Sequence, residues 1–215
     1  MFKSRYLLLS FFVLTFWGCA SNTPYKIVQD FKQQDIRLIA VMPLENETGD
    51  KEAAEILRRE ILESLYFKGY PKIPLSLIDE QIVLKQKDQV NKESSARMIG
   101  SALDVDAVLF CTLQKWKSSL FLVYGSSSVA ASFELRSAKT GETLWSTSLG
   151  FTKRHVGVTN KRLEGKSLIS LEPMAHDIVA EAIATIPDGS ESVSSKPPSR
   201  KFKLRKWLKP RNDSI

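Results

Sequence analysis

The sequence predicts an α/β fold in which helices pack on a single mixed sheet. Two nearly continuous apolar runs, at residues 36–43 and 105–116, are typical of central strands covered on both faces. Three other segments, at residues 51–67, 92–103 and 171–186, carry apolar residues at three- and four-residue spacing, which is typical of helices with one buried side. Because strands and helices are interleaved along the chain, we expect helices against one or both faces of the sheet.

The helix at residues 51–67 is the best-delimited element of the first half. A polar loop supplies capping residues before it, and Gly69 and Pro71 end it. In order, the other elements expected in this half are a strand at 36–43, a loop at 45–50, a short strand at 73–79, a helical turn or two at 79–86 and a helix at 92–103.

The second half is a strand meander closed by a helix. Residues 129–136 alternate between apolar and more polar side chains, so this strand has one dry and one wetter face. Serines near Gly125 leave open whether the segment around them is one strand or a pair. In order, the expected elements are a strand at 105–116, one strand or two at 120–137, a turn at 138–141, a strand at 143–151 and a helix at 171–186.

Composition divides the chain into four segments. We expect a signal peptide at 1–18, a tether at 19–35, the α/β domain at 36–187 and a basic, disordered tail at 188–215. Of the formal charge of +7, the tail contributes +5 and the signal peptide +2, so the domain is close to neutral. No charge argument for nucleic-acid binding therefore applies to the domain.

Cys19 is the most informative single residue. It follows a positive N-terminus and an apolar run at 6–17, which is too short to span a bilayer. Gly18 and Cys19 match the bacterial lipobox, whose cysteine is acylated, whereas Phe16 and Trp17 depart from its usual residues. The alternative is an ordinary signal peptide in which Cys19 is incidental.

The destination expected from the lipobox is the outer membrane, facing the periplasm. Ala20 and Ser21 follow the cysteine, so the Asp that acts as an inner-membrane retention signal is absent from that position. Two or three acyl chains would anchor the protein stably.

The tail carries a second candidate contact site. Cations alternate with aromatic and aliphatic residues there, which suits either an arm that contacts anionic head groups or a partner, or a solvated extension. Both interpretations stay open. The candidate contact residues are Lys201, Phe202, Lys203, Arg205, Lys206 and Trp207.

We expect the protein not to be an enzyme and to need no cofactor or metal. His155 and His176 lack a second His or Cys at metal-ligand spacing, and the sequence has no nucleophile elbow or phosphate-binding glycine loop. We interpret His176 as a surface or packing residue. Cys111 lies in an apolar strand, which indicates a buried structural thiol.

The acidic loop before the first helix allows two interpretations. Glu45, Glu47 and Asp50 could hold a divalent cation, or they could satisfy free N–H groups and the dipole at the helix start. We favour the second.

Three local motifs carry a family resemblance. They are residues 39–43 with Asn46 and Glu47 after them, residues 105–109 entering a strand, and residues 140–145 following a strand end. With these motifs the stretch 30–148 resembles a family of bacterial lipoproteins first noticed as a meningococcal genome-derived surface antigen. It is also distantly similar to the N-terminal domain of the translocation protein TolB and to the curli-secretion lipoprotein CsgG. The family usually has Asp where Ser137 stands, and Ser still permits a side-chain turn bond.

The resemblance implies a fold like that of the TolB N-terminal domain and a scaffolding role in the periplasm. The implied function is a non-enzymatic accessory subunit of an envelope transport or secretion complex. Its expected partners are the membrane, through the lipid anchor, envelope proteins and further copies of the chain. The alternative function is a regulatory binding module, such as a peptidoglycan-synthase activator; a periplasmic hydrolase is a third class.

Overall fold

A six-stranded mixed sheet forms the centre of the computed structural model, which describes residues 23–84, 91–121, 124–156 and 171–189. The strands are β1 (Tyr25–Ile27), β2 (Ile39–Val41), β3 (Glu45–Asn46), β4 (Ala107–Phe121), β5 (Tyr124–Ser137) and β6 (Thr143–Val156). They lie in the order β1-β6-β5-β4-β2, and β3 pairs with β4 further along that strand. β2 and β3 run parallel to β4, and the other described pairings are antiparallel.

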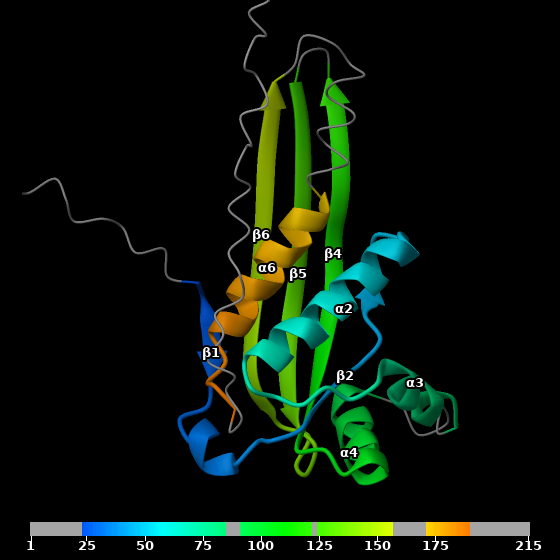
Figure 1. Ribbon diagram of the computed structural model, residues 1–215, viewed down its shortest axis with the longest axis vertical. Coiled ribbons are helices and arrows are strands. Elements are labelled where there is room, and N and C mark those ends of the chain that lie inside the picture. The colour runs from blue at the N-terminus through cyan, green and yellow to red at the C-terminus, as the bar shows by residue number, and fades with distance from the viewer. Residues whose placement is uncertain (1–22, 85–90, 122–123, 157–170, 190–215) are drawn as a thin grey trace, which may run out of the picture.

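Helices cover the two faces of the sheet unequally. α2 (Lys51–Phe67) and α6 (Leu171–Ala184) lie across one face and enclose the larger apolar cluster (Figure 1). α3 (Leu75–Leu84) and α4 (Lys92–Leu103) pack around a smaller cluster on the other face, near β2 and the start of β4. A short 3-10 helix, η2 (Phe31–Gln34), follows β1.

The predicted α/β class is confirmed, and so are its main helices and strands. α2 has the predicted bounds, and the Asp50 carboxylate caps it by accepting a 3.0 Å hydrogen bond from the N–H of Ala53. The predicted dry face of β5 is also confirmed, because Val129, Ala131, Phe133 and Leu135 are all buried.

The prediction of a strand at residues 73–79 is wrong. α3 begins at Leu75, after Pro74, whose carbonyl accepts a 3.1 Å hydrogen bond from the N–H of Leu77. Ile78 is fully buried in the smaller cluster, and Leu75 and Ile82 pack against the same cluster. These three positions are separated by three and four residues, so the segment has helical rather than strand periodicity.

The expected tether is partly folded. Residues 25–27 form the edge strand β1, which pairs with β6 at Trp145, Ser146 and Thr147, and Phe31 in η2 is buried. The sequence does not indicate this pairing, because β1 is only three residues long and all three are exposed.

β4, β5 and β6 extend together well past the helices as a three-stranded arm (Figure 1). Of the two alternatives for residues 120–137, the pair is confirmed: one strand ends at Phe121 and the next starts at Tyr124, and Gly125 itself lies inside β5, where it pairs with both Leu120 and His155. β4 ends at Phe121 and β5 starts at Tyr124, so the connection between them lies at residues 122–123, outside the described residues.

Candidate functional site

The candidate site lies on the sheet face opposite α2 and α6, next to the N-terminal end of α4. An open groove of about 600 Å³ is found there, between β1, the middle of the sheet and α4. Polar side chains from five separate elements line it. They are Lys26, Lys92, Thr112, Ser132, Glu134 and Ser148.

Lys92 is the charged centre of this groove. Its Nζ atom lies 3.1 Å from Oε2 of Glu45 and 4.0 Å from Oε2 of Glu134, and 6.0 Å from the centre of the Phe110 ring. Glu45 also accepts a 2.7 Å hydrogen bond from the Thr112 hydroxyl. Partial burial raises the pKa of Glu45, but the hydrogen bonds from Thr112 and Lys92 and the charge of Lys92 outweigh it and hold the pKa below its usual value. Lys92 therefore links α4 to β3 and β5.

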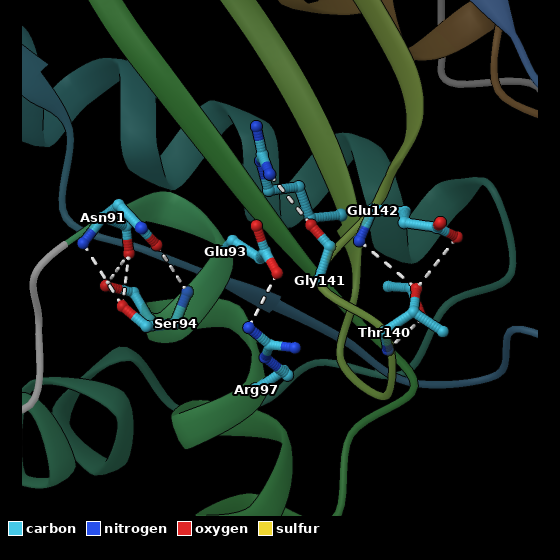
Figure 2. A network of polar contacts seen from close by, with 10 residues as sticks. Asn91, Glu93, Ser94, Arg97, Thr140, Gly141 and Glu142 are labelled. Carbon is cyan, nitrogen blue, oxygen red and sulfur yellow. Dashed lines mark hydrogen bonds and ion pairs between the residues drawn. The ribbon is translucent and has the colours of Figure 1, made fainter.

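The turn between β5 and β6 packs against the first turn of α4 (Figure 2). Asn91 caps α4 through a reciprocal pair of hydrogen bonds with Ser94, at 2.8 and 3.2 Å. The carbonyl of Gly141 accepts a 2.8 Å hydrogen bond from the Arg136 guanidinium. Gly141 has a φ of +77°, and a Cβ atom there would collide with Cγ of Glu93. The position thus requires glycine both for its backbone and for its space.

Rows of hydroxyl and cationic side chains continue this face onto the arm. No Asp or Glu occurs at residues 115–133 or 143–156, so the charge is balanced near Lys92 and positive further out. Hydroxyls can donate and accept hydrogen bonds, and the cations attract anionic groups, so the face is suited to contact with a polar partner. Cross-strand neighbours are Thr112, Ser132 and Ser148; Lys117, Ser128 and Thr152; and Ser119, Ser126 and Arg154.

The predicted lipid anchor and contact residues lie outside the described residues. Cys19 belongs to the undescribed segment 1–22. The same holds for Lys201, Phe202, Lys203, Arg205, Lys206 and Trp207, in the segment 190–215. They stay predictions. Among the helices that the structure describes, none has the length and apolar character needed to cross a membrane.

Cys111 and His176 lie where the sequence predicted. The Cys111 thiol is buried, and burial raises its pKa, so it is not a reactive thiolate. His176 is on the surface of α6, with Nδ1 2.9 Å from a carboxylate oxygen of Glu60. His155 lies at the end of β6, and its side chain is outside what the structure describes.

The acidic loop does not act as one unit. Asp50 caps α2, whereas Glu45 joins the Lys92 network. Within the described residues, no group of three or more His, Cys, Asp or Glu side chains is placed to hold a metal ion.

The family motifs contain residues that hold the elements together. The Asp106 carboxylate accepts two hydrogen bonds, at 2.9 and 3.0 Å, from the backbone N–H groups just before β2. The hydroxyl of Ser137 accepts two from the following turn, at 3.3 and 3.2 Å, so the predicted side-chain turn bond is confirmed. Trp145 is fully buried, and its Nε1 donates a 2.9 Å hydrogen bond to the hydroxyl of Thr185.

Sequence reasoning missed the groove because its residues are far apart in the chain. Lys92 was assigned only to a helix start, and Glu134 only to the wetter face of a strand. The alternation in β5 was the one usable signal, since it showed that Ser132 and Glu134 share a face. It could not show that Lys92 and Glu45 meet them there.

A single α/β domain with one helix-covered sheet face and one more open, polar face is the class of protein that these features define. The family model described as "Putative lipoprotein GNA1162-like" matches residues 28–207. The chain therefore belongs to the GNA1162-like lipoprotein family, and the resemblance carried by the three motifs is confirmed.

Several solved structures are similar to this chain. Lipoprotein GNA1162 from Neisseria meningitidis is 19% identical, with 65% of this chain and 98% of that chain covered and a TM-score of 0.49. A PelC dodecamer from Paraburkholderia phytofirmans is 14% identical over 76% of this chain and 94% of that chain, also at 0.49. The LpoB C-terminal domain from Escherichia coli is 20% identical over 54% and 83%, at 0.36. A search of curated proteins finds no match.

Proposed function

We propose that this protein is an outer-membrane lipoprotein, anchored through Cys19 and facing the periplasm. In this proposal it is a non-enzymatic accessory or scaffold subunit of an envelope transport or secretion complex. Membership of a lipoprotein family supports the anchor. The open groove around Lys92 supports a binding role, because Lys92 is paired with Glu45 and Glu134 and the remaining lining is largely hydroxyl and apolar, with Lys26 at its edge.

The observation that carries the proposal is the short connection between Cys19 and the sheet. β1 begins at Tyr25, so five residues separate the two. At a maximum of ~3.6 Å per residue, the Cα of Cys19 lies within roughly 22 Å of the Cα of Tyr25. An acylated Cys19 would hold the whole domain at the membrane surface, where membrane-embedded complexes present their periplasmic parts.

The same distance disfavours the alternative function, a peptidoglycan-synthase activator that reaches the inner membrane. A tether of about 15 residues could have extended roughly 50 Å. With β1 folded into the sheet, less than half of that reach is left.

Lengthening the connection separates the two functions. We would insert a flexible Gly/Ser linker of about 30 residues between Ser21 and Asn22, which adds roughly 30 Å of average reach. The insertion leaves Thr23 and β1 intact. Tagged wild-type, insertion and Cys19→Ala proteins would be extracted from the native envelope in detergent after chemical cross-linking, and their partners identified by mass spectrometry.

The two functions predict opposite results. If the protein is an accessory of an outer-membrane complex, transport or secretion subunits should co-purify with the wild-type protein. The inserted linker should then reduce the amount recovered. If the protein is a synthase activator, a cell-wall synthase should co-purify with the wild-type protein. The linker should then preserve or increase the amount of synthase recovered. Intact mass measures the anchor separately: wild-type protein without acyl mass would refute lipidation at Cys19.

A further inference from the structure

The two ends of the described chain border one depression on the helix-covered side of the molecule. Tyr25 and Ile27 of β1 line it, together with Asp188 and Gly189 after α6. β1, η2 and the end of α6 lie together at one side, and the arm extends away from them (Figure 1). β1, through which the chain enters the sheet, and residues 188–189 after α6 therefore border the same depression.

The chain is fixed up to these exit points. At the N-terminal side, the Thr23 hydroxyl donates a 2.6 Å hydrogen bond to Glu181, and the carbonyl of Pro24 accepts one of 2.7 Å from Thr147. At the C-terminal side, the N–H of Gly189 donates a 2.9 Å hydrogen bond to the carbonyl of Lys68. Neither end can swing away from the depression without breaking these bonds.

We propose that the surface formed by β1, η2 and the adjoining ends of α2 and α6 rests on the lipid bilayer. The inference depends on the proposed lipid anchor. Thr23 is four residues from Cys19, so an acylated cysteine places it within roughly 14 Å of the membrane. α2, with its 17 residues, is about 25 Å long. The connection to Cys19 is therefore too short for the side of the domain opposite β1 to face the membrane.

The side chains of this surface suit a lipid interface. Tyr25 is 47% exposed and Ile27 is 37% exposed, although both are apolar or aromatic. Lys68, directly after α2, lines the depression as well. Lys32 lines the same depression. Exposed aromatic and aliphatic residues with lysines around them favour the boundary between head groups and acyl chains, and the lysines favour anionic lipid.

The basic tail adds to this attraction. Residues 190–215 contain eight Lys or Arg residues and two acidic ones, and they follow directly on Gly189. Eight cations so close in sequence to the depression would strengthen the attraction of the anchored protein to anionic lipid.

Depth measurements on the acylated protein test the proposal. Single cysteines would be placed at Tyr25 and Ile27, with Lys117→Cys on the arm and Val83→Cys on α3 as controls; Val83 is 73% exposed. Each would carry an environment-sensitive fluorophore, in vesicles of phosphatidylethanolamine and phosphatidylglycerol. Cys111 is buried and Cys19 is acylated in this preparation, so neither competes for the label.

We expect a blue shift and quenching by spin-labelled lipid at positions 25 and 27 and neither effect at 83 and 117. Acylated protein with all four probes in water, or with the control probes in lipid instead, would overturn the membrane-facing surface and leave the anchor intact. A blue shift at 25 and 27 that depends on protein concentration, without lipid quenching, would assign the surface to a second copy. Absence of acyl mass would refute the anchored function, and this proposal with it.

Discussion

Replacing Gly141 by Ala should destabilise the domain more than replacing Gly49 by Ala. Both glycines have almost the same left-handed backbone, with φ of +77° and +78°. A Cβ atom at Gly49 meets nothing within 4 Å, whereas one at Gly141 collides with the Glu93 side chain and lies 3.0 Å from the Glu93 carbonyl oxygen. The two substitutions share the backbone cost and differ in the steric one.

The magnitudes follow from these surroundings. A left-handed Ala costs about 1–2 kcal/mol, which is the whole effect expected for Gly49→Ala. Overpacking adds about 1–3 kcal/mol at Gly141, so Gly141→Ala should lose about 2–5 kcal/mol of unfolding free energy. Glu93→Ala should restore part of this loss, because it removes the side chain that collides but not the backbone oxygen.

The assay is equilibrium urea unfolding followed by far-ultraviolet circular dichroism, with the slope m compared among variants to check that the transition is unchanged. The double-mutant cycle of Gly141→Ala with Glu93→Ala should give a coupling of about 1 kcal/mol or more. Equal losses for Gly49→Ala and Gly141→Ala, or a coupling near zero, would refute the inference that the turn is packed tightly against α4.

Three further variants test the packing of individual side chains. Burial, and then the charge of Asp188, raise the pKa of Tyr70 to about 12, so the contribution of Tyr70 to stability, up to about 3 kcal/mol, should be lost as pH rises from about 10 to 12, and Tyr70→Phe should remove that part of the loss in alkaline urea titrations. Trp145→Phe should cost about 2–4 kcal/mol in urea unfolding, through lost volume and the lost hydrogen bond to the Thr185 hydroxyl, which keeps its own bond to the carbonyl of Ala182; wild-type stability would contradict this. Asp106→Ala should cost about 2 kcal/mol, and faster amide exchange should appear at Leu38.

Helix periodicity explains why so much of the fold was predictable. The stripe of Leu57, Ile61 and Leu65 in α2 is fully or almost fully buried, and Met174 and Ile178 in α6 are fully buried. Each stripe depends on side chains within one local segment, so the sequence contains the necessary information.

The failures have the opposite cause. β1 exists because three exposed residues find a free edge on β6, and a free edge is a property of the finished sheet. The groove arises in the same way, because β3 brings Glu45 beside Thr112 of β4, 67 residues away in the chain. Neither contact leaves a periodic signal in its own segment.

The outer edge of the three-stranded arm could pair with a strand of another copy, and the structure shows features that oppose such pairing. Past β3, no described strand pairs with the outer edge of β4, so among the described residues its backbone N–H and carbonyl groups from Lys115 onward have no strand partner. A bulge between Leu113 and Lys115 bends this edge, and Lys115 and Lys117 place cations on it.

These features predict that edge pairing is prevented by charge. The outer strand of the arm on the other side, β6, carries Arg154 and also Lys153, which is paired with Asp177, so two copies that paired β4 with β6 would bring the lysines of β4 near the Arg154 cation. Lys115→Thr with Lys117→Thr should therefore produce concentration-dependent association in sedimentation velocity at low salt, with Lys26→Thr as a control away from the arm. If the double variant sediments as the wild type does at all concentrations, the lysines are not what keeps the edge open, and the bulge would have to suffice.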